Sequence, residues 1–149
     1  MRSDVVRFAF LLLVLVFGAS LECVLPRLPG AGFPVLLSAV LVFAARRPIG
    51  VAAGFAVAAG FVEDSLSTLP FATSVACYLM MTAAVRAGVS RTVAAVFAYP
   101  LYQLWLWAWV PDSGGVFARV LLAFPAGFVT AVATASVVVA LERKAAADG

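Results

Sequence analysis

Six apolar runs follow one another along the chain, separated by short segments that carry charged residues, proline or glycine. The runs occupy residues 5–25, 33–45, 49–62, 70–85, 92–110 and 116–141. They are rich in Ala, Val, Leu and Phe, and they lack the strict alternation of apolar and polar residues that indicates a membrane strand. A helix needs about 20 residues to cross a bilayer. The pattern therefore predicts an all-α fold, a polytopic transmembrane helix bundle of six spans, with residues 1–149 forming a single transmembrane domain.

The second run is short for a span, because residues 33–45 make only about 20 Å of helix at about 1.5 Å per residue. It can still cross if it includes part of the preceding Pro- and Gly-rich turn and if Arg46 and Arg47 extend their side chains to the headgroups. Five spans result if this run only dips into the bilayer.

Composition supports the membrane assignment. Of the 149 residues, 65% are hydrophobic and 11% are charged, whereas soluble domains have roughly 45–50% and about 25%. The first run could also be a cleaved signal peptide, since Gly18-Ala19-Ser20 resembles a cleavage site. We expect a retained helix instead, because the run is long enough to anchor the chain and the remaining runs are equally apolar.

The basic residues indicate an orientation. With six spans, one side of the membrane receives eight of the ten Lys and Arg residues. These are Arg2, Arg7, Arg46, Arg47, Arg86, Arg91, Arg143 and Lys144. Basic loops favour the cytoplasmic side, so both termini are expected in the cytoplasm. Glu63, Asp64 and the Tyr- and Trp-rich segment 99–109 are then expected near the outer face, because Tyr and Trp favour the membrane interface.

Few residues could support catalysis. The chain contains no histidine, and its two cysteines, Cys23 and Cys77, lie in apolar runs without metal-ligand spacing. The polar candidates near the membrane segments are Glu22, Glu63, Asp64, Tyr99, Tyr102, Gln103, Asp112 and Arg119. No nucleophile–base set and no phosphate-binding loop is present. We therefore expect a protein that is not an enzyme, with no cofactor, no metal and no nucleic-acid partner.

The adjacent carboxylates Glu63 and Asp64 mark the most unusual stretch. On a helix their side chains would point about 100° apart, so they would not face one another. Three interpretations stay open: solvation at a membrane exit, a structural role in which Asp64 caps the next helix, and proton or ion relay. Upstream, Gly50 and Gly54 form a small-xxx-small pattern, which predicts close helix packing within the chain or with a partner.

The stretch from Gly60 to Phe71 resembles the signature of the MreD family of bacterial rod-shape-determining membrane proteins. Members have a Gly, an Asp four residues later and then a Pro followed by an apolar residue, and Gly60, Asp64, Pro70 and Phe71 have this arrangement. The family commonly has glycine where Ala72 stands here, and glycine is also common in the hinge that carries Ser67. The resemblance covers about 30 residues, from Gly54 to Val85, and elsewhere only hydropathy and length.

This resemblance implies a non-enzymatic scaffold of the peptidoglycan elongation machinery in the bacterial inner membrane. The implied partners are an MreC-like bitopic protein, an MreB-like filament and peptidoglycan synthases. Gly60, Asp64, Pro70 and Phe71 would then form a structural or partner-contact hinge.

A second interpretation comes from a different class, the substrate-binding subunits of energy-coupling-factor vitamin importers, which are also six-helix proteins. Such a subunit needs an outward pocket with several hydrogen-bonding groups. The outer loops here are short and polar groups are few. The bulky run around Phe8 also lacks the small residues expected for docking to a transporter. The sequence therefore favours the scaffold.

Overall fold

The computed structural model describes residues 2–25, 32–67, 70–109 and 115–147, and within these ranges it contains helices and no strand. The helices are α1 (Arg2–Val24), α2 (Val35–Arg46), α3 (Ile49–Leu66), α4 (Thr73–Arg86), α5 (Arg91–Trp109) and α6 (Val116–Ala147). The predicted all-α fold is confirmed. The connecting turns are expected at 26–32 and 111–115, and all of their residues except Gly32 and Gly115 lie outside the described part of the chain.

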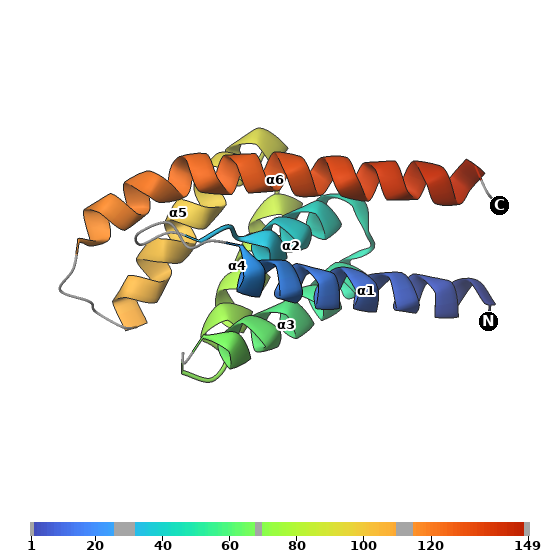
Figure 1. Ribbon diagram of the computed structural model, residues 1–149, viewed down its shortest axis with the longest axis horizontal. Helices are drawn as coiled ribbons and strands as arrows, with labels where there is room; N and C mark the ends of the chain where they lie inside the picture. The colour runs from blue at the N-terminus through green and yellow to red at the C-terminus, as the bar shows by residue number, and fades with distance from the viewer. Residues whose placement is uncertain (1, 26–31, 68–69, 110–114, 148–149) are drawn as a thin grey trace.

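The short α2 is the centre of the fold (Figure 1). It contacts all five other helices, and its residues from Leu36 to Ala44 are buried. A helix that is apolar on every side can be enclosed by neighbours all round. Its burial among other helices distinguishes it from a span whose sides face lipid.

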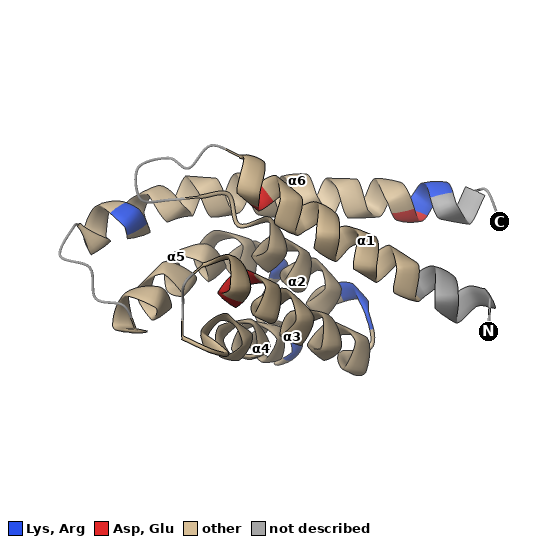
Figure 2. Cartoon of the chain, turned by 60° about the horizontal axis from the view of Figure 1, so that its bottom comes forward, with Lys and Arg blue, Asp and Glu red and all other residues tan. Residues whose placement is uncertain are grey.

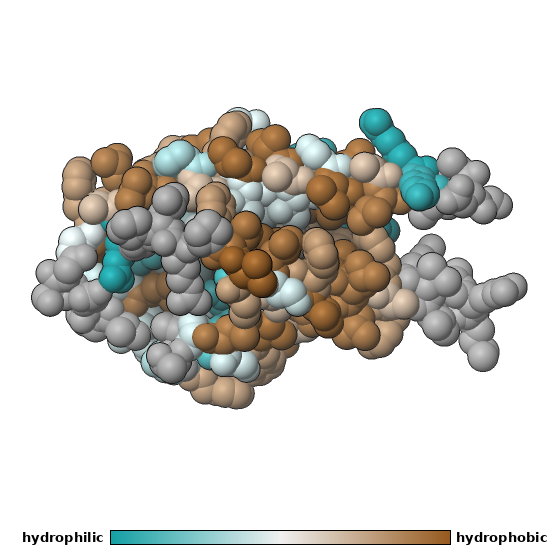
Figure 3. Space-filling model, in the orientation of Figure 1, coloured by the Kyte–Doolittle hydropathy of each residue, from teal (hydrophilic) through white to brown (hydrophobic). Residues whose placement is uncertain are grey.

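Two helices within the described residues are long and apolar enough to cross a membrane, at Ile49–Leu66 and Val116–Lys144. Much of the surface is also apolar (Figure 3), with Phe8 on α1 and Phe117 on α6 each more than two-thirds exposed. Soluble monomers rarely expose apolar patches larger than a few hundred Å². The structure therefore supports membrane association of this chain.

Charged residues lie toward both ends of the long axis and also near its middle (Figure 2). The start of α1, the α2–α3 connection and the end of α6 lie at the same end (Figure 1). There Glu142 of α6 pairs with both Arg46 and Arg47, whose Nη2 atoms lie 2.5 and 2.6 Å from its carboxylate oxygens. The turn between α4 and α5, flanked by Arg86 and Arg91, instead lies near the middle of the long axis.

Candidate functional site

The α3–α4 junction contains the residues that the motif singled out. Gly60 is buried in α3, where a Cβ atom would lie 2.5 Å from the Cα of Val75 and 2.6 Å from its backbone nitrogen. Real Cβ contacts are not that short, so only glycine allows α3 and α4 to approach this closely. Gly60 therefore sets the spacing between these helices.

Asp64, one turn further along α3, binds the start of α4. Its Oδ1 accepts a hydrogen bond of 2.9 Å from the backbone N–H of Ser74. This N–H belongs to the first turn of α4, where no intrahelical acceptor exists. The carboxylate thus acts as a cap from a neighbouring helix, and its negative charge is favourable at a helix N-terminus. Its other oxygen, Oδ2, is buried without a partner among the described residues.

Ser74 extends this junction to α5. It is fully buried, and its hydroxyl lies 2.8 Å from the hydroxyl of Tyr102. The indole N–H of Trp105 donates to the carbonyl of Thr73 over 3.0 Å. Sequence reasoning missed Ser74, because a serine inside an apolar helix gives no signal until its neighbours are known. Three helices therefore meet at the first turn of α4.

The segment before α4 differs from the expectation. The apolar run that starts at Pro70 predicts a helix with this proline in its first turn, but α4 begins at Thr73. The reason is Ala72, whose φ of 63° and ψ of 15° are left-handed and interrupt the helical path. The Pro70 carbonyl accepts the hydroxyl of Thr73 over 2.8 Å. Phe71 is 84% exposed, and its ring centroid lies 5.3 Å from that of Phe61.

Gly50 and Gly54 lie on α3 with nothing within 4 Å of the Cβ position that each would acquire. Neither glycine packs against another helix among the described residues of this chain. The small-xxx-small pattern predicted close packing either within the chain or with a partner. Packing with a partner stays a prediction.

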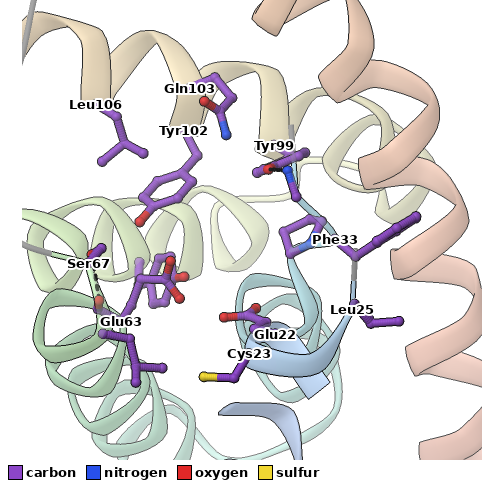
Figure 4. Close-up of a pocket in the computed structure, with 14 residues that line it drawn as sticks. Glu22, Cys23, Leu25, Phe33, Glu63, Ser67, Tyr99, Tyr102, Gln103 and Leu106 are labelled. Carbon is purple, nitrogen blue, oxygen red and sulfur yellow. Dashed lines mark hydrogen bonds between the residues drawn. The ribbon is translucent and has the colours of Figure 1, made fainter. Parts of the chain in front are cut away.

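A cavity of about 260 Å³ lies beside this junction, between the end of α1, the start of α2, the end of α3 and the second half of α5 (Figure 4). Its polar side chains come from four helices and the segment beside them. They are Glu22, Cys23, Glu63, Ser67, Tyr78, Tyr99, Tyr102 and Gln103. The adjacent residues Glu63 and Asp64 diverge, as their spacing on a helix requires: Glu63 lines the cavity and Asp64 binds α4.

Two carboxyl groups face each other in this cavity. Glu22 from α1 and Glu63 from α3 point toward one another and lie within hydrogen-bonding reach (Figure 4). Glu22 also accepts a hydrogen bond of 2.7 Å from the backbone N–H of Leu36 in the first turn of α2. A helix N-terminus is a favourable place for such an acceptor. No backbone or side-chain N–H among the described residues donates to the Glu63 carboxylate.

The cavity wall is aromatic. The ring centroids of Tyr78 and Tyr102 are 5.6 Å apart, and those of Tyr99 and Tyr102 are 6.4 Å apart. The hydroxyl of Tyr99 accepts the backbone N–H of Gly32 over 2.9 Å, which ties the segment before α2 to α5. Sequence reasoning placed Tyr99 and Tyr102 near an interface, but both are buried.

The polar residues singled out from the sequence therefore divide into groups. Glu22, Glu63, Tyr99, Tyr102 and Gln103 meet at the cavity. Tyr78 was not among these polar candidates, because a single tyrosine in an apolar helix fits a core position equally well. Arg119 lies on α6 and does not line the cavity, and Asp112 is outside the described residues.

No family model, no curated protein and no solved structure matches the chain.

Proposed function

We propose that this chain is a non-enzymatic membrane component of the bacterial cell-shape and peptidoglycan elongation machinery, acting as a scaffold through helix contacts. The observation that carries the proposal is the α3–α4 junction. Gly60, Asp64 and the position of Ala72, which the MreD resemblance names by spacing alone, serve one structural purpose. Gly60 allows close approach, Asp64 caps α4, and residue 72 has the left-handed conformation that glycine adopts without strain.

The membrane arrangement belongs to the same proposal. Six spans with both termini in the cytoplasm of a bacterium, in its inner membrane, agree with the common end of α1 and α6 and with Arg46, Arg47, Arg143 and Lys144 at that end. The cavity and the α3–α4 junction would then face the outer side. The middle position of the α4–α5 turn requires α4 and α5 to cross at a steep tilt.

The partner-facing surface in this proposal is a strip along α3. Gly50, Gly54 and Phe61 are all exposed, and their spacings of four and seven residues put them on one helix face. Phe71 extends the strip, since its ring contacts that of Phe61. A transmembrane helix, such as that of an MreC-like bitopic protein, could approach closely over the two glycines and pack against the aromatic end.

Capture of the tagged protein from native membranes tests this proposal. Wild type is expected to recover a bitopic MreC-like protein and peptidoglycan synthases, identified by mass spectrometry. Gly54→Leu should reduce that recovery without lowering thermal stability, because no other helix among the described residues lies within 4 Å of the new Cβ position. Ala133→Leu, at an exposed position of α6, is the matched control. Equal recovery with Gly54→Leu would remove the α3 strip from the proposal, and absence of elongation proteins would remove the function.

One observation favours the second candidate, a substrate-binding subunit of an energy-coupling-factor vitamin importer. The cavity collects more hydrogen-bonding groups than the outer loops alone offered, including Glu22, Tyr99 and Gln103. Recovery of paired ATPase subunits in the same capture experiment would favour this candidate over the scaffold.

A further inference from the structure

The charges in the cavity are unbalanced. Glu22 and Glu63 contribute two carboxyl groups, and none of the described residues that line the space is Lys or Arg. Glu22 faces the N-terminal end of α2 and accepts a backbone N–H there. Glu63 has no such donor among the described residues. Two facing carboxylates repel each other unless a proton or another cation lies between them, so this space favours an occupant with positive charge.

A second, independent observation points to a ligand. Tyr78 lines the cavity and is only 1% exposed. Its hydroxyl makes no hydrogen bond with the described part of the chain, although buried hydroxyls usually have a partner. Tyr99 and Tyr102 line the same cavity, so three tyrosines border the space that holds the carboxyl pair. Tyrosine faces attract cations within about 6 Å, ammonium groups in particular.

The size of the space limits the occupant. A cavity of about 260 Å³ is slightly smaller than the roughly 300–1,000 Å³ of sites for drug-sized ligands. Water takes about 30 Å³ of liquid volume, so the cavity has room for several waters or for one group of a few heavy atoms. If the two carboxyl groups share one proton, one negative charge remains on the pair, and a single positive charge balances it.

We propose that this cavity binds an ammonium group, carried by a small free amine or by a lipid headgroup, with Glu63 as the counter-ion and the three tyrosines as its aromatic wall. The inference is independent of the scaffold proposal, since it rests on the cavity and not on the α3 strip.

The test uses the full chain in nanodiscs made only of phosphatidylglycerol, whose headgroup carries no ammonium. Tetramethylammonium is the probe, and tert-butanol is the neutral analogue of similar size. Titration calorimetry should give saturable binding of tetramethylammonium, at least about tenfold tighter than of tert-butanol. Glu63→Gln should weaken binding at least about tenfold, whereas Glu142→Gln, the same change at the opposite end of the molecule, should leave it unaltered.

A measurement on the unmodified chain guards against a variant that fails to fold. Cys23 lines the cavity and is exposed, while Cys77 is buried. Tetramethylammonium should slow the reaction of Cys23 with a small thiol reagent at least about twofold, and tert-butanol should not. Equal effects of the two probes, or equal binding by Glu63→Gln and wild type, would overturn the proposal.

Two further arms identify the source of the charge. Adding phosphatidylethanolamine to the nanodiscs should weaken tetramethylammonium binding if a lipid headgroup is the natural occupant, and should not if a free amine is. Arg27 lies outside the described residues. If tetramethylammonium binds only after Arg27→Gln, the chain supplies its own cation and the proposal is wrong.

Discussion

The contact at Gly60 gives the sharpest prediction. In Gly60→Ala the added Cβ would lie 2.5 Å from the Cα of Val75, where ordinary contact begins at 3.4 Å. Because the two nearest atoms, the Cα and backbone nitrogen of Val75, belong to the backbone, no side-chain rotation relieves the clash. Helices α3 and α4 would have to separate by about 1 Å, which would stretch the 2.9 Å bond from Ser74 to Asp64 beyond hydrogen-bonding distance.

The expected cost follows from these contacts. Overpacking costs typically about 1–3 kcal/mol, and loss of a cap adds about 1 kcal/mol. The better helix propensity of alanine offsets up to about 1 kcal/mol. We expect a net loss of about 2 kcal/mol, which lowers the melting temperature by about 4–8 °C for a chain of this size.

Gly54→Ala is the matched control, since it makes the same chemical change on the same helix where nothing lies within 4 Å. It should leave the melting temperature unchanged or raise it by a few degrees. Thermal unfolding in detergent can be followed by tryptophan fluorescence, because Trp105 is bonded to Thr73 beside the contact. If Gly60→Ala melts at or above the temperature of Gly54→Ala, the close approach of α3 and α4 is wrong.

Three other changes test the junction and the orientation. Ala72→Gly should stabilise the protein by about 1 kcal/mol in the same melting assay, because Ala72 has a left-handed φ of 63°; a destabilised variant would contradict that conformation. Asp64→Ala should lower stability by about 1–2 kcal/mol through loss of the Ser74 bond, and more than Asp64→Asn, which keeps an acceptor; equal melting of the two variants would argue against the cap. In intact spheroplasts a membrane-impermeant maleimide should label Cys23, which is exposed in the last turn of α1, and a Cys23→Ser chain should stay unlabelled because Cys77 is buried; protection of Cys23 until the membrane is opened would reverse the proposed orientation.

Much of the helical pattern could be predicted from the sequence, because continuous apolar runs bounded by Pro, Gly and charged residues have few other solutions. The run at 33–45 was recognisable as short, but its burial at the centre was not, since hydropathy treats a lipid-covered and a protein-covered helix alike. The start of α4 was placed too early because Pro70 is a favourable first-turn residue. The left-handed conformation of Ala72 depends on contacts that a single sequence does not display.

The candidate site could also be predicted in part. A carboxylate between apolar runs is costly unless it has a partner, so Glu22, Glu63 and Asp64 could be singled out individually. The separate roles of these three carboxylates could not be predicted, because they depend on how α1 lies against α2 and α3. Tyr99 and Tyr102 occur beside three tryptophans, which favoured an interface. Only the packing of α5 against its neighbours, α4 beside Tyr102 and α6 beside Tyr99, separates the buried tyrosines from the exposed Trp107 and Trp109.

The bonds of Glu22 and Asp64 follow one design. Each carboxylate lies two residues before the last residue of its helix, and each accepts the N–H of the second residue of the following helix. The chain thus contains two helical hairpins, each closed by its first helix on the free amides of its second. Those amides need only one formed turn to become available. During synthesis, the α1–α2 hairpin can therefore close before α3 exists, and the α3–α4 hairpin then assembles against a finished unit that already presents Glu22.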